Sequence, residues 1–252
     1  MALSAGDKRT LEDTGYLLVP GLIPPDRART ALAAINASLG RSGLPPDELP
    51  RMEALTFCPE LVGEAAILDL YRATPLVDLA EAALGAGAVR EPRDAQIALR
   101  FPTPGADQVD PRPHIDGLPR ALNGVAAGTL YHFTALAAVF LSDVDEPFAG
   151  NFTVWPGSHR ALADYLATND AINTLARPEV PFPPVALPEP PRQLIVKAGD
   201  ALLAHYLLVH GVSANLSPNI RYAVFFRLFH GEHAPDAIAA LGDLWRHWPG
   251  LR

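Results

Sequence analysis

The order of helical and strand-like segments is the feature of this chain that most constrains its fold. Up to about residue 90 the sequence predicts mainly helices, as where Ala28, Leu32, Ile35 and Leu39 recur at helical spacing. Beyond that point short apolar runs alternate with turns, and the 26 prolines of the chain limit the length of any helix. Helices followed by many short strands favour an α+β fold, a sandwich or barrel of strands with helices outside it.

Hydrophobic periodicity, helix-capping residues and the positions of glycine and proline predict the individual helices and strands. Asp26 lies in the first turn of a helix that we expect Gly40 to end, and residues 41–50 read as a turn-rich connection. We expect the 252 residues to form one domain, helical over about 1–90 and strand-rich over about 91–230. The predicted helices span 7–13, 26–39, 60–73, 75–84, 158–168 and about 236–246; the predicted strands span 16–19, 95–101, 130–144, 150–155, 193–197, 201–206 and 222–229.

Charge and cysteine content restrict the class of protein. A net charge of −8, without a basic stripe to offset it, argues against binding to nucleic acid or to an anionic membrane. The single cysteine, Cys58, excludes an intrachain disulfide framework, and we expect it to be a buried small hydrophobic residue. The N-terminus lacks the apolar core of a signal peptide, and the apolar run 133–141 is far shorter than the ~20 residues that span a bilayer. We therefore expect a soluble cytoplasmic protein.

Two candidate metal ligands lie two residues apart in the segment PHIDG (113–117). On an extended backbone, residues i and i+2 project to the same face, so His114 and Asp116 can converge on one ion. Two ligands leave a metal site incomplete, and the later strands offer His205 and His210 as a third. Their spacing of five places them on opposite faces of a strand, so at most one of them is expected at the site.

A basic residue follows in the next predicted strand. Arg221 lies eleven positions after His210, and antiparallel pairing of consecutive strands would place it across from that histidine. A guanidinium stays charged and binds a carboxylate through two parallel donors, so Arg221 suits an anionic cosubstrate.

The ordered set of His114, Asp116, a histidine before glycine (His210) and Arg221 resembles the iron(II)- and 2-oxoglutarate-dependent dioxygenases, and more narrowly the phytanoyl-CoA dioxygenase-like family. The resemblance covers roughly residues 90–230 and, in general style, the helical N-terminal third. Two further segments are similar to that family: GNFTVWPGSH (150–159) and GDALLAHYLLVHG (199–211).

The resemblance implies a fold, a metal and a cosubstrate. The fold would be a double-stranded β-helix, a cupin-like jelly roll, with helices packed on the outside of one sheet. His114, Asp116 and His210 would bind Fe(II) as a facial triad, which leaves positions open for a bidentate oxo-acid and dioxygen. Arg221 would hold the distal carboxylate of 2-oxoglutarate. In halogenating relatives a small residue replaces the carboxylate ligand, so Asp116 favours hydroxylation.

Four further polar residues are candidates for contacts near the metal. Gln96 and Arg100 share one face of a predicted strand, and His132 and Thr134 share one face of another. We expect Gln96 and Thr134 to contact 2-oxoglutarate, and Arg100 and His132 to contact the substrate.

Three residues beside the motifs are weaker candidates. Trp155 and His159 are expected to serve the fold of the PGSH turn rather than the chemistry. The family pattern has a serine two residues after the distal histidine, where this chain has Val212; Ser213 lies one position later. A cosubstrate contact from Ser213 is therefore not part of the expected site.

The expected activity is oxidation of an unactivated C–H bond of a small polar metabolite by hydroxylation. The composition is typical of bacteria with GC-rich genomes, in which such enzymes tailor secondary metabolites, including sugar-containing intermediates. The same cofactor also supports oxidative cyclisation or desaturation. A hypothesis from another class is a non-redox metal-binding protein, a cupin-like isomerase or a sugar-binding module, which would not need Arg221. The sequence makes no prediction of the oligomeric state.

Overall fold

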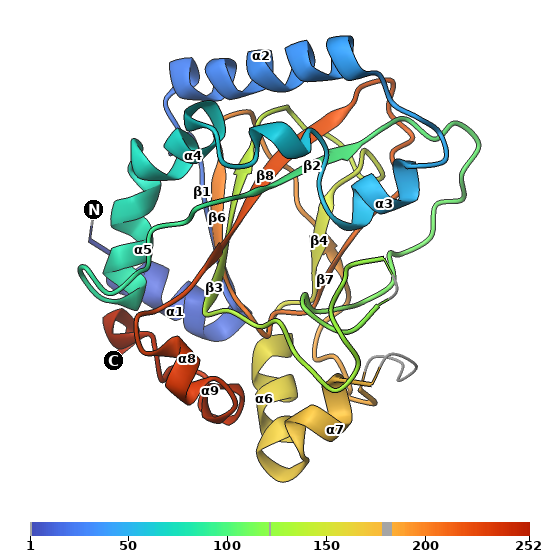
Figure 1. The fold of residues 1–252 in the computed structure, drawn as a ribbon. Helices are drawn as coiled ribbons and strands as arrows, with labels where there is room; N and C mark the ends of the chain where they lie inside the picture. Colours follow the sequence, from blue (N-terminus) through green and yellow to red (C-terminus); the bar gives the residue numbers. More distant parts are fainter. Residues whose placement is uncertain (1, 121, 178–182) are drawn as a thin grey trace.

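Two antiparallel sheets occupy the centre of the molecule, in a computed structural model that describes residues 2–120, 122–177 and 183–252 (Figure 1). The larger sheet has the strand order β1-β6-β3-β8-β2, and the smaller one has the order β5-β4-β7. The larger sheet consists of β1 (Tyr16–Val19), β6 (Ala201–His205), β3 (Ala135–Phe140), β8 (Arg221–Leu228) and β2 (Gln96–Arg100); the smaller of β5 (Arg192–Gln193), β4 (Phe152–Val154) and β7 (His210–Val212).

The apolar run of β3 is buried on both faces. Ala137 and Val139 join one hydrophobic cluster, and Leu136, Ala138 and Phe140 join another, because successive side chains of a strand point to opposite faces. The first cluster lies between the larger sheet and helices, and the second includes residues of both sheets. Burial on both faces explains why this strand is continuously apolar instead of alternating.

Helices from the first third of the chain cover the outer face of the larger sheet (Figure 1). Their apolar residues, such as Leu11, Ile35, Leu70 and Leu79, share a cluster with Phe226 of β8. None of the helices among the described residues is long and apolar enough to cross a membrane. The helices are α1 (Ala5–Thr14), α2 (Pro25–Ser42), α3 (Leu49–Ala54), α4 (Ala65–Arg72), α5 (Leu76–Leu84), α6 (Ser158–Thr168), α7 (Ala171–Leu175), α8 (His233–Asp236) and α9 (Ala239–Gly242), with 3-10 turns at Pro59–Leu61 and Pro249–Leu251.

Several boundaries differ from those that the sequence predicts. Helix α2 continues through Gly40 and ends before Gly43, which has a φ of +67° that glycine adopts without strain. Helices α3 and α7 were not predicted at all. A single helix over 236–246 is wrong, because α9 ends at Gly242 and the chain then turns inward to bury Trp248, which is only 1% exposed.

The strand predicted over 130–144 is shorter in the structure. Only Ala135–Phe140 pairs with β6 and β8, whereas Val144 forms a separate bridge to Val196. The N–H of Thr134 still donates to the carbonyl of Leu228 in β8, but the side chain of Thr134 contacts His233 and the chain before it is not part of the sheet. This shortening determines where two of the predicted site residues lie.

Candidate metal centre

The loop that carries His114 is paired to β7 through its backbone. The N–H of His114 donates to the carbonyl of His210 at 2.9 Å, and the N–H of His210 donates back to His114 at 2.9 Å. Residues that exchange both hydrogen bonds in an antiparallel pair present their side chains on the same face. The two imidazoles therefore lie side by side, with their ring centroids 4.6 Å apart.

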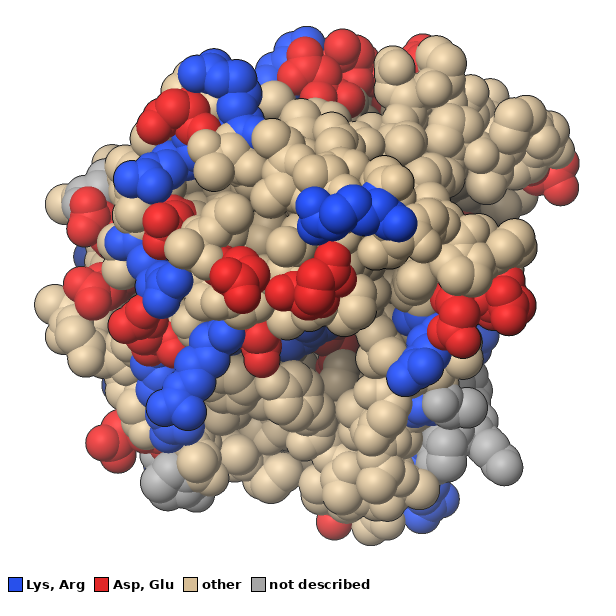
Figure 2. All heavy atoms as spheres, turned by 45° about the horizontal axis from the view of Figure 1, so that its top comes forward, with Lys and Arg blue, Asp and Glu red and all other residues tan. Residues whose placement is uncertain are grey.

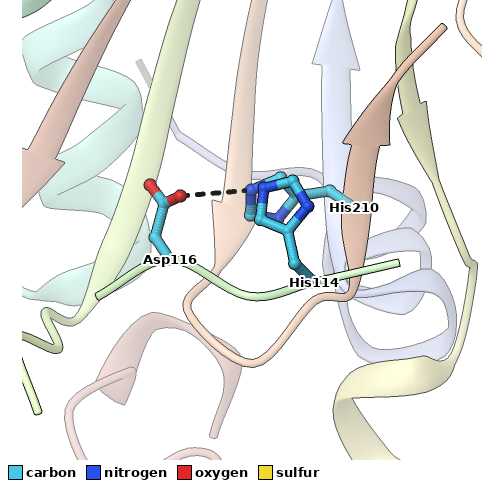
Figure 3. A group of neighbouring side chains, drawn as sticks. All are labelled: His114, Asp116 and His210. Atoms are coloured by element: carbon cyan, nitrogen blue, oxygen red, sulfur yellow. Dashed lines mark ion pairs between the residues drawn. The ribbon is translucent and has the colours of Figure 1, made fainter. Parts of the chain in front are cut away.

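Asp116 completes a group of three potential ligands. One ligand atom each from His114, Asp116 and His210 lies within 4.8 Å of the others. Figure 3 shows the carboxylate of Asp116 pointing toward the imidazole of His210, and Oδ1 is 3.5 Å from Nε2 of that ring. Two imidazoles and one carboxylate on a common face form the donor set of a non-haem iron(II) facial triad.

Hydrogen bonds to the backbone orient both rings for metal binding. Nδ1 of His210 lies 2.9 Å from the carbonyl of Leu208, and Nδ1 of His114 lies 3.4 Å from the carbonyl of Arg112. Proton donation from Nδ1 leaves the lone pair on Nε2, which is the usual arrangement for a histidine that ligates a metal. In that tautomer Nε2 of His210 and Oδ1 of Asp116 face each other with lone pairs, and a cation between them removes the repulsion.

The protonation states also suit a metal. Burial, together with the nearby His210, lowers the pKa of His114 from 6.5 to about 4, although Asp116 opposes this shift. Burial alone would raise the pKa of Asp116, but the surrounding charges, Arg227 foremost, hold that pKa well below its usual range. At neutral pH the site thus offers a neutral His114 and a carboxylate, the forms that bind metal ions.

Arg227 was missed by the sequence interpretation, although it contacts a candidate ligand directly. Its Nη2 lies 2.8 Å from Oδ2 of Asp116 and 2.9 Å from Oε1 of Gln96. The guanidinium also lies over the ring of Phe133, 5.8 Å from its centroid. Period-two alternation along β8 would have indicated this residue, because it shares a strand face with Arg221.

Arg221 is buried with an unused hydrogen-bond donor. Its Nε donates to Gly150 at 2.9 Å and its Nη1 donates to Ala98 at 3.1 Å, whereas Nη2 has no partner among the described residues. Arg100 lies opposite it in the β2–β8 pairing, and burial together with this second positive charge lowers the pKa of Arg221 to about 9. A buried, repelled guanidinium with a free donor fits a carboxylate.

The expected position of Arg221 relative to His210 is partly wrong. Arg221 does begin a strand, but β7 belongs to the smaller sheet and β8 to the larger one, so the two residues are not ladder partners. They instead line the same cavity from different sheets. The three consecutive strands β6, β7 and β8 alternate between the sheets, which sequence spacing does not reveal.

The metal cavity, defined as the cavity lined by His114, Asp116 and His210, has a volume of about 500 Å³. Gln96, Arg100, Arg221 and Arg227 line it as well, so the structure brings the predicted Gln96 and Arg100 to the candidate ligands. Helix α3 contributes a further part of the wall, through residues 50, 53 and 54.

His132 and Thr134 do not line the metal cavity, which corrects their predicted roles. They lie before the start of β3, beside a separate small cavity closed by the C-terminal segment. The hydroxyl of Thr134 is 3.2 Å from Nδ1 of His233, and the carbonyl of His132 is 3.1 Å from Nε2 of the same ring. The hydroxyl of Thr134 and the backbone carbonyl of His132 therefore bind the C-terminal segment, whereas Nδ1 of the His132 ring has no partner among the described residues.

The remaining candidates lie in structural positions. His205 uses both ring nitrogens, with Nδ1 accepting from the N–H of Leu207 at 3.0 Å and Nε2 lying 2.8 Å from the carbonyl of Leu244. Ser213 accepts a hydrogen bond from the N–H of Asn151 at 2.9 Å and does not line the metal cavity. Further residues buried in the core are Trp155, His159 and Cys58.

Comparison with known proteins relates this geometry to characterised folds. The model of the phytanoyl-CoA dioxygenase (PhyH) family matches residues 11–223. No curated protein sequence matches the chain.

Among solved structures, the non-heme alpha ketoglutarate dependent carbocyclase SnoK from nogalamycin biosynthesis is similar with a TM-score of 0.55 and 20% identity, over 98% of this chain and 92% of SnoK. HygX from Streptomyces hygroscopicus, with nickel, 2-oxoglutarate and hygromycin B bound, has a TM-score of 0.55 and 18% identity, over 90% of this chain and 88% of HygX. The non-heme alpha ketoglutarate dependent epimerase SnoN has a TM-score of 0.50 and 20% identity, over 89% of this chain and 81% of SnoN. These likenesses concern the fold.

Proposed function

The chain belongs to the phytanoyl-CoA dioxygenase family of iron(II)- and 2-oxoglutarate-dependent enzymes, and we propose that His114, Asp116 and His210 are its iron ligands. We also propose that Arg221 holds the distal carboxylate of 2-oxoglutarate. The observation that carries both assignments is one cavity that contains three converging ligand atoms and a buried guanidinium donor that has no partner in the described part of the chain. These residues match the needs of a divalent cation and a dicarboxylate together.

The proposed fold is a double-stranded β-helix that forms one domain over residues 1–252. Two features support it: the antiparallel pairing within both sheets, and a hydrophobic cluster that contains residues of both. In this arrangement the metal cavity lies between the sheets, with His210 on the smaller sheet and Arg221 on the larger one.

Bound iron(II), with 2-oxoglutarate and dioxygen, supplies an oxidant strong enough to remove hydrogen from an unactivated carbon while 2-oxoglutarate becomes succinate. The side chains of the protein orient the metal ligand Asp116 and bind the cosubstrate. Arg227 engages Oδ2 of Asp116 and so leaves Oδ1 as the oxygen directed at the metal position. Arg221 and Arg100 supply positive charge for the cosubstrate from the other wall of the cavity.

The proposed reaction is hydroxylation of a small polar secondary metabolite. The carboxylate of Asp116 occupies the position where a halogenating relative needs a small residue. Oxidative cyclisation or desaturation by the same centre is the second candidate, since the fold is shared with enzymes described as a carbocyclase and an epimerase. Product mass distinguishes the two, because hydroxylation adds one oxygen whereas cyclisation or desaturation removes two hydrogens.

Succinate release tests the cofactor assignment without a known substrate. Iron(II)-loaded protein with 2-oxoglutarate in air is expected to form succinate slowly, and the Arg221→Gln variant is expected to lose this activity. Arg160→Gln is the control variant. Arg160 pairs with Asp13 on the surface and lines neither the metal cavity nor the other cavities described. Succinate formation that is independent of Arg221 would refute the role proposed for that residue. Metal binding without any consumption of 2-oxoglutarate would favour a non-redox metal-binding protein.

A further inference from the structure

A second and larger hollow adjoins the metal cavity. It has a volume of about 890 Å³, and we call it the arginine groove after Arg72, Arg90, Arg93 and Arg227, which line it. Arg227 also lines the metal cavity, so the two spaces meet at the residue that contacts Asp116.

The backbone ties the groove to the ligand-bearing loop. The N–H of Tyr131, which lines the groove, donates to the carbonyl of Gly117 at 3.0 Å, and Gly117 directly follows Asp116. A molecule in the groove would therefore reach the edge of the metal site. It would occupy space that 2-oxoglutarate, anchored at Arg221, does not need.

Basic residues are concentrated in these two spaces. Seven arginines line the metal cavity and the groove together, against four carboxylates, in a chain whose net charge is −8. Basic and acidic side chains are intermingled on the face of the molecule shown in Figure 2. The positive balance is thus a property of the cavities and not of the whole protein.

Two of the groove arginines have no acidic partner within the described part of the chain. Arg72 pairs with Glu91 at 3.2 Å, but the guanidinium of Arg90 donates only to the carbonyl of Gly231. The side chain of Arg93 has no hydrogen bond or ion pair with any described residue. Asp94 is the remaining carboxylate of the groove. An anion would gain attraction from Arg90 and Arg93, whereas an amine would meet repulsion.

Aromatic side chains form the apolar part of the groove. Tyr131 is 51% exposed, and its ring lies edge-on to Phe229 with the centroids 6.0 Å apart. An exposed tyrosine packed on a half-buried phenylalanine lies beside arginines that have no acidic partner among the described residues. This combination suits a ligand with a planar or apolar body and a charged end.

From these observations we propose that the arginine groove binds the substrate through a carboxylate or phosphate, with the apolar body of the substrate on Tyr131 and Phe229. The inference rests on the proposed function and narrows its substrate class: an acidic metabolite is accepted and a polyamine-like or aminoglycoside-like cation is rejected. Arg90 and Arg93 would position the substrate, and Arg227 would lie beside the part of the substrate that extends toward the metal.

Calorimetry with small probes tests the groove directly. The protein is loaded with nickel(II), a redox-inert substitute for iron, and saturating 2-oxoglutarate, and is titrated with 1-naphthoate, 1-naphthyl phosphate and 1-naphthylmethylamine. At least one anion is expected to bind about tenfold more tightly than the amine, and the tighter anion identifies the charged group. The double variant Arg90→Gln/Arg93→Gln is expected to bind that anion about tenfold more weakly than the unmutated protein does. Arg160→Gln is the control, and its affinity for the anion should be unchanged.

Three results would overturn the groove assignment: equal affinity for the amine, no binding of either anion under saturating 2-oxoglutarate, or anion affinity that the double variant leaves unchanged. Succinate formation by the iron-loaded, unmutated protein separates this failure from failure of the proposed function. Succinate without anion binding refutes the groove alone, and anion binding without succinate refutes the dioxygenase assignment on which the inference rests.

Discussion

The guanidinium of Arg227 and the carboxylate of Asp116 meet at 2.8 Å, through the carboxylate oxygen that does not face His210. This pair joins the metal cavity to the arginine groove. It also assigns the two oxygens of Asp116 to different neighbours, which favours a single-oxygen contact with a metal.

Replacement of Arg227 by glutamine is expected to weaken metal binding by about tenfold or more, because hydrogen-bonded partners of metal ligands typically contribute that much. Loss of the positive charge also raises the pKa of Asp116, so the defect should be larger at low pH. Titration with nickel(II) at two pH values measures both effects. Arg227→Lys, which keeps the charge but not the planar fork, should rescue part of the affinity; unchanged affinity in Arg227→Gln would contradict the positioning role.

Replacement of Arg221 by glutamine should separate the cosubstrate from the metal. We expect the KM for 2-oxoglutarate to rise by about 10- to 100-fold, the range expected for a lost charge-assisted hydrogen bond, while the Kd for nickel(II) stays nearly constant. Succinate assays and metal titration on the same preparation provide both values. A parallel loss of metal affinity would mean that Arg221 supports the cavity structure instead of binding the cosubstrate.

Gly117 is expected to be intolerant of a side chain. It has a φ of +76°, and a Cβ at this position would lie 1.8 Å from the carbonyl oxygen of Tyr131. Gly117→Ala should therefore displace the loop next to Asp116 and reduce metal affinity at least several-fold. Gly124→Ala is a matched control, since Gly124 has a φ of +72° but no atom within 4 Å of the added Cβ. Equal effects of the two substitutions would show that backbone strain, and not the contact with Tyr131, is responsible.

Stability is expected to fall in mild acid because several histidines are buried in their neutral form, His205 and His159 among them. Burial lowers the pKa of His205 from 6.5 to about 4, and burial together with the neighbouring His205 lowers that of His159 to about 3. Between pH 6.5 and about 4 the unfolded chain therefore binds more protons than the folded one. The free energy of unfolding should decrease by about 1.4 kcal/mol per pH unit for each histidine as the pH falls through this range.

Urea unfolding at pH 7, 6 and 5 measures this slope, and the variant His159→Gln assigns it. The variant removes one of the titrating rings. The decrease in its free energy of unfolding per pH unit should therefore be smaller by about 1.4 kcal/mol than that of the unmutated protein. An identical slope in both proteins would exclude His159 as a source of the acid sensitivity.

The sequence alone determined the parts of the site that depend on local geometry. The spacing of His114 and Asp116 predicts a shared face, and the structure brings both together with His210 in one cavity that also contains Arg221. The helical first third and the strand-rich remainder are likewise local properties, which is why most elements were predicted even where their boundaries were displaced.

Tertiary structure alone decided which residues meet across the two sheets. Arg227 contacts Asp116, and Thr134 contacts His233, only because distant segments pack together. The exchanged backbone hydrogen bonds between His114 and His210 also join segments that lie far apart in the chain. Side-chain periodicity determines which residues share a face of one strand. It carries no information about the segment that this face opposes, because that pairing depends on burying both hydrophobic clusters at once.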